Sequence, residues 1–309
     1  MEQHSDELPV VVGLGPVDAA TVSPVLDGVA RFVADPSPAD LEHAVGAIVR
    51  AHVNLGKAMF ATLPALRVVA RTGVGTERVD LDEARARSIP VVITPGANTE
   101  AVAEGALAHL LALTKSLSPL THLLSTGAWE DRATIPVGDL RGGTLAILGY
   151  GRIGRAVARL AHAFGMNCVA YDPFVTEADI RLAASLDEAL FGATHVSVHL
   201  PATDNTRGLL NREVIASLAP DTILVNLARG DILDLDAALW GLETGHLGGL
   251  GLDVFPTEPP AHHPVFEHPR VILTPHVMGL TTASTAATFI QAAEGIADVL
   301  RGKSPAFQA

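Results

Sequence analysis

The sequence has few cysteines and few basic residues, and both shortages exclude classes of function. Cys168 is the single cysteine, so an internal disulfide and a metal site built from several cysteines are excluded. Lysine and arginine number 21 against 34 acidic residues, which gives a formal net charge of -13. A chain this acidic, without a cluster of Lys and Arg, repels nucleic-acid backbones and anionic membranes. We therefore expect neither nucleic acid nor a membrane as a partner.

Long apolar runs are also missing. No run approaches the roughly 20 residues that a membrane span needs. The N-terminal residues 1–9 are acidic and polar, without the basic start and apolar core of a signal peptide, so we expect a cytoplasmic protein. The chain does have 48% hydrophobic residues, enough to bury a large core. Because 309 residues are too many for one ordinary core, two domains are expected.

Short apolar, β-branched runs alternate with Ala-rich polar stretches. Such runs, without strict alternation, are typical of strands covered on both faces, and hence of parallel sheets flanked by helices. The first series of predicted strands covers residues 10–15, 31–34, 47–50, 67–73 and 90–96. One long helix is predicted at 98–117, and a Gly/Pro-rich passage leads from it into a second series. That series, typical of a doubly wound α/β domain, covers 144–148, 168–172, 195–200, 223–228, 250–255 and 271–276.

A glycine-rich motif, GYGRIG, follows the first strand of the second series. Its glycines are Gly149, Gly151 and Gly154, and a helical pattern comes after them. In that setting the first glycine permits a tight turn, the second lets a pyrophosphate approach the backbone, and the third lets helix and strand pack closely. Asp172 ends the next strand, 18 residues after Gly154 (172 − 154), where it can bind ribose hydroxyls and repel a 2′-phosphate. The motif predicts NAD rather than NADP.

The glycine motif alone leaves alternatives open. A tight strand–helix turn that binds nothing has the same pattern, and so does a methyltransferase with a similar turn. Another glycine pair, GLGP at 13–16, lacks a third glycine and has proline where a helix should begin, so we assign it no cofactor.

Three ionisable residues follow later predicted strands. Arg229, Glu258 and His276 lie near strand carboxyl ends, where open α/β sheets bind ligands. Hydride chemistry on a carbonyl needs a cation to hold a carboxylate, a histidine to move a proton, and a carboxylate to orient that histidine. Each residue also has a plainer interpretation: a surface turn, a solvated loop and a cap of the next segment, respectively.

Together these motifs resemble the D-isomer-specific 2-hydroxyacid dehydrogenases, and among them the D-3-phosphoglycerate dehydrogenase-like members. The motifs stand in the family's order: RTGVGTERVD, TPGANTEAVAE, LGYGRIGR, VSVHLPAT, NLARGDILD, GLDVFPTEPP and TPHVMG. The resemblance implies an α/β fold of two doubly wound domains. A Rossmann NAD-binding domain of residues 99–285 is inserted in a flavodoxin-like substrate (catalytic) domain of residues 1–98 and 286–309. It also implies a homodimer formed through the NAD-binding domain.

The resemblance assigns roles to individual residues. Arg229 binds the substrate carboxylate and carbonyl, His276 is the proton donor and acceptor, and Glu258 pairs with His276. The other implied substrate-binding residues are Arg50, Val74, Gly75 and Asn98. The implied cofactor-binding residues are Val74, Gly149, Gly151, Arg152, Ile153, Gly154, Asp172, Leu200, Leu227, Ala228, Arg229, Asp253 (toward the nicotinamide amide), His276 and Gly279.

The implied activity is NAD-dependent interconversion of a D-2-hydroxy acid and its 2-keto acid. Candidate substrates are 3-phosphoglycerate and glyoxylate/hydroxypyruvate. Arg50 matches an arginine that contacts the substrate phosphate in phosphoglycerate enzymes, but an ordinary strand-end arginine fits equally well. The alternative function is an NAD(H)-sensing binding protein that resembles the family's transcriptional corepressors. Glu258 disfavours the formate-oxidising relatives, which pair their histidine with glutamine.

No metal is expected. Hydride transfer from a nicotinamide needs none, and the histidines at 262, 263 and 268 lie in a Pro-flanked loop without the usual ligand spacing.

Overall fold

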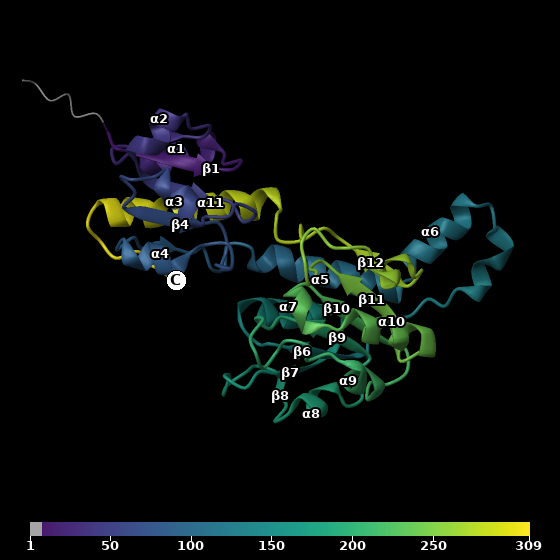
Figure 1. Cartoon of the computed structure of the whole chain (residues 1–309). Helices are drawn as coiled ribbons and strands as arrows, with labels where there is room; N and C mark the ends of the chain where they lie inside the picture. Colours follow the sequence, from purple (N-terminus) through teal and green to yellow (C-terminus); the bar gives the residue numbers. More distant parts are fainter. Residues whose placement is uncertain (1–7) are drawn as a thin grey trace, which may run out of the picture. The chain divides into compact units, whose positions relative to one another are not determined.

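The computed structural model describes residues 8–309, which fall into two compact units (Figure 1). Unit 1 combines Met1–Asn98 with Leu280–Ala309, and unit 2 is Thr99–Gly279. The second crossing thus comes before the position at 285/286 expected from sequence, because helix α11 (Thr282–Leu300) belongs to unit 1 over its whole length. Each unit is a parallel sheet covered by helices on both faces, which confirms the predicted fold class of two doubly wound α/β domains.

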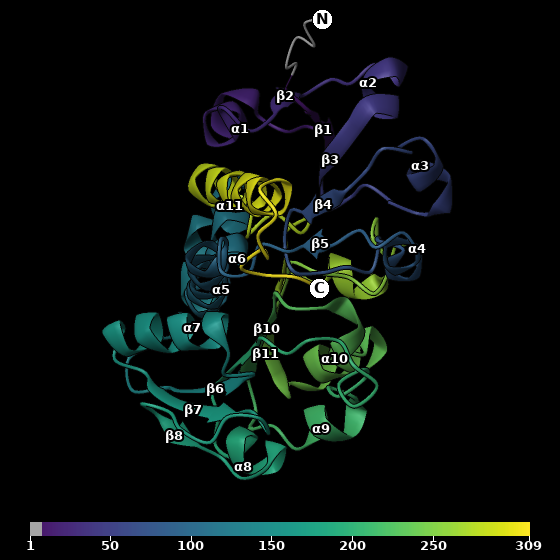
Figure 2. The ribbon, with the colours of Figure 1, turned by 90° about the vertical axis from the view of Figure 1, so that its left-hand side faces the viewer.

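The sheet of unit 1 has the strand order β2-β1-β3-β4-β5. Its strands are β1 (Val10–Leu14), β2 (Arg31–Val33), β3 (Ala44–Val49), β4 (Val68–Arg71) and β5 (Val91–Val92). Helices α1 (Ala19–Leu26) and α11 cover one face, as Figure 2 shows. The other face is covered by α2 (Pro38–His43), α3 (Lys57–Ala61) and α4 (Leu81–Ala86). Burial on both sides explains why these strands read as continuous apolar runs.

The sheet of unit 2 has the order β12-β11-β10-β9-β6-β7-β8. Its strands are β6 (Thr144–Leu148), β7 (Asn167–Tyr171), β8 (Arg181–Leu182), β9 (His195–Val198), β10 (Thr222–Asn226), β11 (Leu247–Leu252) and β12 (Val271–Leu273). The predicted strands are all present, and β8 is an addition too short for a periodicity signal. Because the chain reverses direction across the sheet between β6 and β9, the carboxyl ends of these strands form a topological switch point, where such sheets bind ligands.

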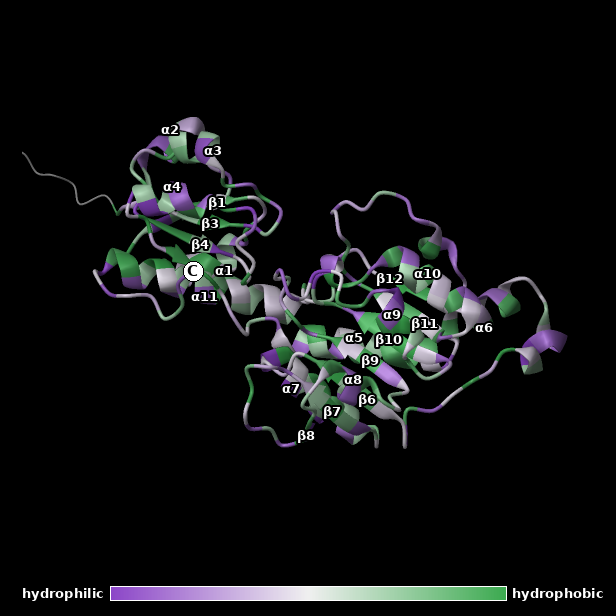
Figure 3. Ribbon diagram, turned by 60° about the horizontal axis from the view of Figure 1, so that its bottom comes forward, coloured by the Kyte–Doolittle hydropathy of each residue, from purple (hydrophilic) through white to green (hydrophobic). Residues whose placement is uncertain are grey.

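Helices α5 (Thr99–Thr114) and α7 (Arg152–Ala163) cover one face of this sheet. Helices α8 (Leu186–Leu190), α9 (Arg212–Ala216) and α10 (Leu235–Thr244) cover the other. The hydrophobic colouring in Figure 3 runs along the strands of both units, between their helices. Two short 3-10 turns, η2 (Gly230–Ile232) and η3 (Pro264–Glu267), follow β10 and β11.

The prediction of one continuous helix at 98–117 is wrong at its end. Ser116 adopts a left-handed conformation with φ of 50°, and its hydroxyl donates a hydrogen bond to the carbonyl of Pro136. The chain therefore starts a second helix, α6 (Leu117–Ser125), followed by the 3-10 turn η1 (Trp129–Thr134). These elements form an arm that projects from the rest of unit 2 (Figure 1).

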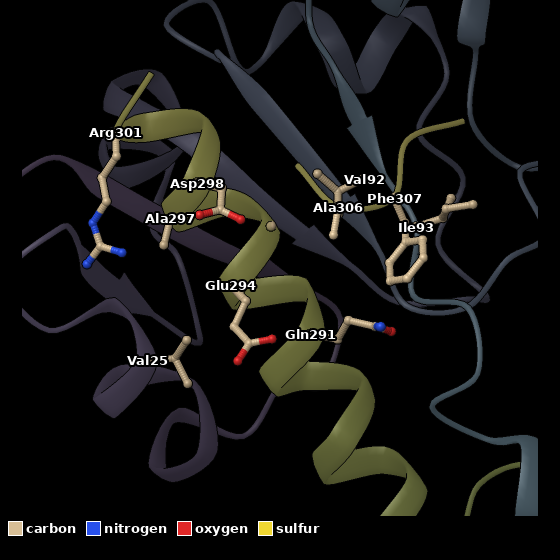
Figure 4. A pocket seen from close by; sticks show the side chains of 11 residues that line it. Val25, Val92, Ile93, Gln291, Glu294, Ala297, Asp298, Arg301, Ala306 and Phe307 are labelled. Carbon is tan, nitrogen blue, oxygen red and sulfur yellow. The ribbon is translucent and has the colours of Figure 1, made fainter. Parts of the chain in front are cut away.

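Unit 1 contains a cavity of about 460 Å³ beside the C-terminal segment (Figure 4). That segment pairs with the edge strand β5, since the amide of Ala309 donates to Val91 and the amide of Ile93 donates to Phe307. None of the residues predicted from sequence as site residues lines this cavity. Within residues 8–309, no helix is both long enough and apolar enough to cross a bilayer.

Candidate active site

The glycine turn after β6 has backbone geometry that only glycine accommodates. Gly149 has φ of 97°, and a Cβ there would lie 2.6 Å from the carbonyl oxygen of His199, just after β9. A Cβ on Gly154 would lie 2.1 Å from the carbonyl oxygen of Gly149. The first glycine therefore permits the turn, and the third lets α7 pack against it, as the motif predicts.

Gly151 caps α7 without any side-chain hydrogen bond, and a Cβ at this position would meet open space. The first backbone N–H groups of an α-helix have no partner within the helix, and those of Arg152 and Ile153 begin α7. Partnerless N–H groups at the positive end of a helix dipole suit a phosphate. This part of the chain therefore fits the pyrophosphate of a dinucleotide.

Asp172 lies beside the same turn. One carboxylate oxygen accepts a hydrogen bond of 2.8 Å from the amide of Tyr150, and the other accepts one of 3.0 Å from the amide of Phe174. The carboxylate is thus fixed at the mouth of the glycine turn, where the prediction requires it for a ribose. Each oxygen keeps a lone pair for a hydroxyl donor.

Arg229 and Glu258 follow adjacent strands, β10 and β11. A Cβ on Gly230 would lie 2.0 Å from the backbone carbon of Phe255, so glycine lets the segment after Arg229 lie directly on the segment before Glu258. Arg229 is half-buried, and its backbone carbonyl accepts a hydrogen bond from the side-chain amide of Asn226. The backbone of both loops is therefore fixed by packing.

Glu258 and His276 form the pair predicted from sequence. Nδ1 of His276 lies 2.9 Å and 2.8 Å from the two carboxylate oxygens of Glu258. A carboxylate accepts hydrogen bonds, so Nδ1 carries a proton and donates, which leaves Nε2 as the ring nitrogen for proton exchange with a ligand. The His276 side chain is 51% exposed, so a ligand can reach it.

Asp253 supports the turn that carries His276. His276 has a left-handed φ of 55° just after β12. The Asp253 carboxylate accepts hydrogen bonds from the amides of Val277 at 3.0 Å and Met278 at 3.2 Å, and from the hydroxyl of Thr274 at 2.6 Å. Asp253 is only 2% exposed. Its role toward the nicotinamide amide stays a prediction, while its contacts hold the loop on both sides of His276.

Sequence reasoning did not single out Thr274. The residue stands in the motif TPHVMG, and the available signal was a hydroxyl two positions before the predicted proton donor. The remaining predicted cofactor residues in unit 2 are the buried Leu200 and Leu227 and the partly buried Ala228 and Gly279. The first three follow the carboxyl ends of β9 and β10, and the glycine turn follows the carboxyl end of β6 in the same sheet. Their cofactor contacts stay predictions.

The other predicted substrate residues belong to unit 1, where they follow β3, β4 and β5. Gly73 and Thr94 are joined by hydrogen bonds in both directions, which links the loop of Val74 and Gly75 to the loop that leads to Asn98. Arg50 follows β3, and its guanidinium lies 5.2 Å from the ring centroid of Phe289. Burial lowers the pKa of Arg50. The predicted residues of unit 1 thus all follow the carboxyl ends of strands of its own sheet.

Comparison with known proteins gives a consistent result. Residues 107–278 match the family described as D-isomer specific 2-hydroxyacid dehydrogenase, NAD binding domain. The chain is 38% identical over 287 residues to a D-3-phosphoglycerate dehydrogenase of Mycobacterium leprae, covering 90% of this chain and 54% of that protein. It is 37% identical over 222 residues to a hydroxypyruvate reductase of Thermotoga maritima, covering 71% of this chain and 72% of that one.

A solved structure, that of the TT0316 protein from Thermus thermophilus, superposes with a TM-score of 0.86 at 33% identity. The match covers 97% of this chain and 99% of that chain. The chain spans about half the length of the phosphoglycerate dehydrogenase relatives that it matches.

Proposed function

Because the chain belongs to the D-isomer specific 2-hydroxyacid dehydrogenase family and is D-3-phosphoglycerate dehydrogenase-like, we propose that it interconverts a D-2-hydroxy acid and its 2-keto acid. Unit 2 contains the NAD-binding domain of this family, and NAD is the cofactor. The observation that carries the proposal is the His276–Glu258 pair, in which Nδ1 and Oε2 are 2.8 Å apart. The pair follows the carboxyl ends of strands of the same sheet as the glycine turn does.

When bound, a nicotinamide would supply or accept the hydride at C2 of the acid. In the reduction, Nε2 of His276 gives its proton to the keto oxygen, and in the oxidation it takes the hydroxyl proton back. Glu258 holds Nδ1 and balances the positive charge that the ring carries before it gives up the proton. Arg229 binds the substrate carboxylate and polarises the adjacent carbonyl.

Within the family the substrate is the finer question. The relatives named above act on 3-phosphoglycerate and on hydroxypyruvate, according to their names. We propose 3-phosphohydroxypyruvate, hydroxypyruvate and glyoxylate as the keto acids to test first, with Arg50, Val74, Gly75 and Asn98 as binding residues. Arg50 supports a phosphate-bearing substrate, because its Nε is buried and has no hydrogen-bond partner among residues 8–309.

The test is NADH oxidation with this panel, in the wild type and in His276→Ala. We expect turnover with at least one keto acid, a loss of about 10²–10⁴-fold in kcat in the variant, and little change in NADH affinity. The kcat of Glu258→Gln should lie between those of the wild type and His276→Ala, since an amide oxygen still accepts a hydrogen bond from Nδ1 but carries no charge. NADH binding without turnover of any acid by the wild type would support the NAD(H)-sensing alternative instead.

We also propose a homodimer that forms through unit 2. Apolar side chains are exposed on the arm and just after it: Leu117 by 52%, Leu124 by 57%, Trp129 by 56% and Val137 by 56%. Apolar residues gathered on one projecting element commonly mark an interface. Light scattering on the intact protein should give twice the mass of the chain, and Leu124→Asp combined with Trp129→Asp should give the monomer. A monomeric wild type at micromolar concentration would contradict the proposal.

A further inference from the structure

His109 is a buried histidine in the apolar helix α5 that none of the motifs includes. It is 3% exposed, and its Nε2 lies 3.3 Å from the hydroxyl oxygen of Thr274. Its Nδ1 is buried and has no hydrogen-bond partner within residues 8–309. A buried polar ring destabilises the fold unless its hydrogen bonds compensate. The one hydrogen bond that the His109 ring makes within residues 8–309 therefore needs an explanation.

The direction of the hydrogen bonds follows from the donors available. The Thr274 hydroxyl has one proton, and this proton goes to the Asp253 carboxylate, which can only accept. Toward His109 the same oxygen must accept, so Nε2 of His109 carries the ring proton and donates. Burial lowers the pKa of His109, against the opposing effect of the Asp253 charge, so the ring is neutral with Nδ1 unprotonated.

The fold leaves space for this ring. A Cβ on Gly251 of β11 would lie 2.8 Å from Nδ1 of His109, so the glycine lets the ring rest on the strand. One helical turn earlier, a Cβ on Gly105 would lie 2.7 Å from Cβ of Met278. Residues 105 and 109 share one face of α5. This face of α5 therefore contacts both ends of the loop 274–278, with His109 at Thr274 and Gly105 at Met278.

We propose that His109 is a positioning residue for His276. Its Nε2–H holds the Thr274 hydroxyl in the orientation that donates to Asp253, and Asp253 in turn holds the amides of Val277 and Met278. The left-handed turn at His276 lies between these anchors. The inference about the loop stands on these contacts, and only its consequence for turnover rests on the proposed function.

The experiment compares three variants. His109→Leu keeps the volume and removes the donor, whereas His109→Gln restores an N–H at a similar reach. His195→Leu is the matched control. His195 is also buried, at 4% exposure, and also contacts α5, where its Nε2 lies 3.1 Å from Thr114 Oγ1, but no hydrogen bond within residues 8–309 links it to Asp253.

The first readout is amide hydrogen exchange at Val277 and Met278, which needs no activity. Losing one hydrogen bond from the network should speed exchange about five- to tenfold in His109→Leu. His109→Gln and the control should match the wild type at these two amides. Unchanged exchange in His109→Leu, or equal acceleration in the control, would overturn the inference.

The second readout is turnover, where His109→Leu should lose about fivefold in kcat at unchanged KM for NADH, with recovery in His109→Gln. If the wild type turns over no acid while the exchange pattern holds, the proposed function fails and the positioning stands. If His109→Leu does not fold, the ¹⁵N chemical shifts of the His109 ring in the wild type, measured by NMR, test the inference instead. They should show His109 neutral with the proton on Nε2, and a charged ring or the opposite tautomer at neutral pH would refute the inference.

Discussion

Two turns occupy equivalent places in the two units, and only one of them suits a nucleotide. Each follows the first strand of its sheet, β1 or β6, and each begins with a Leu–Gly step in which the glycine has positive φ: 90° at Gly15 and 97° at Gly149. Helix α1 is then capped by Asp18, whose carboxylate accepts from the amides of Ala20 and Thr21. Helix α7 is capped by Gly151, which has no side chain to offer.

This difference shows that the sheet alone does not make a cofactor site. Both sheets place a helix N-terminus at the carboxyl end of an interior strand, and both dipoles favour an anion. In unit 1 the protein's own carboxylate satisfies the N–H groups. In unit 2 they stay available for a phosphate. The identity of the N-cap residue therefore separates the two turns.

The largest effect is expected from Gly149→Ala compared with Gly15→Ala. Both substitutions place a Cβ at positive φ, which costs roughly 1–2 kcal/mol. In unit 2 the new Cβ also meets backbone, the carbonyl of His199 at 2.6 Å, whereas in unit 1 its nearest neighbours are side-chain atoms, Cγ of Arg50 at 3.0 Å and Cγ2 of Val53 at 3.2 Å. We expect the Kd for NADH, measured by fluorescence titration, to rise at least 100-fold in Gly149→Ala and to stay within about twofold in Gly15→Ala.

A similar loss of NADH affinity in both variants would show that general destabilisation, and not the geometry of one turn, sets the binding. Thermal unfolding of both proteins should therefore be recorded beside the titration. The comparison is supported if both variants are still folded at the temperature of the titration and their affinities for NADH are unequal.

The sequence was informative where function depends on a local pattern. The motif GYGRIG with Asp172 is such a pattern, and the structure joins its two parts by a hydrogen bond from Tyr150 to Asp172. Contacts between distant segments could not be predicted. His109 and Thr274 are 165 positions apart, and no periodicity in α5 tells which strand or loop its histidine will face. The break at Ser116 was equally hidden, because it depends on a hydroxyl contact with the distant Pro136.

A smaller effect is expected when unit 2 is given the cap of unit 1. In Gly151→Asp the new side chain enters open space and can accept from the first amides of α7, so the fold should be kept or slightly stabilised. The carboxylate then competes with and repels a phosphate, and we expect NADH affinity to fall about tenfold to 100-fold. Gly151→Asn caps the same amides without a charge and should lose less NADH affinity than Gly151→Asp. Equal losses in the two variants would mean that charge at this helix end does not govern binding.

The smallest effect is expected from removing the cap of unit 1. Asp18→Ala leaves the first amides of α1 without their partner, so we expect Tm to fall by about 2–4 °C while NADH affinity is unchanged. The hydrogen bond from the Thr21 hydroxyl, more than those from the amides, lowers the pKa of Asp18 in the folded protein. A lowered pKa means that the carboxylate stabilises the fold above its unfolded pKa of about 4 and loses this effect as pH falls below it. The difference in Tm between wild type and Asp18→Ala should therefore narrow between about pH 5 and pH 3, and a difference that stays constant across this range would show that the charge of Asp18 plays no part in capping α1.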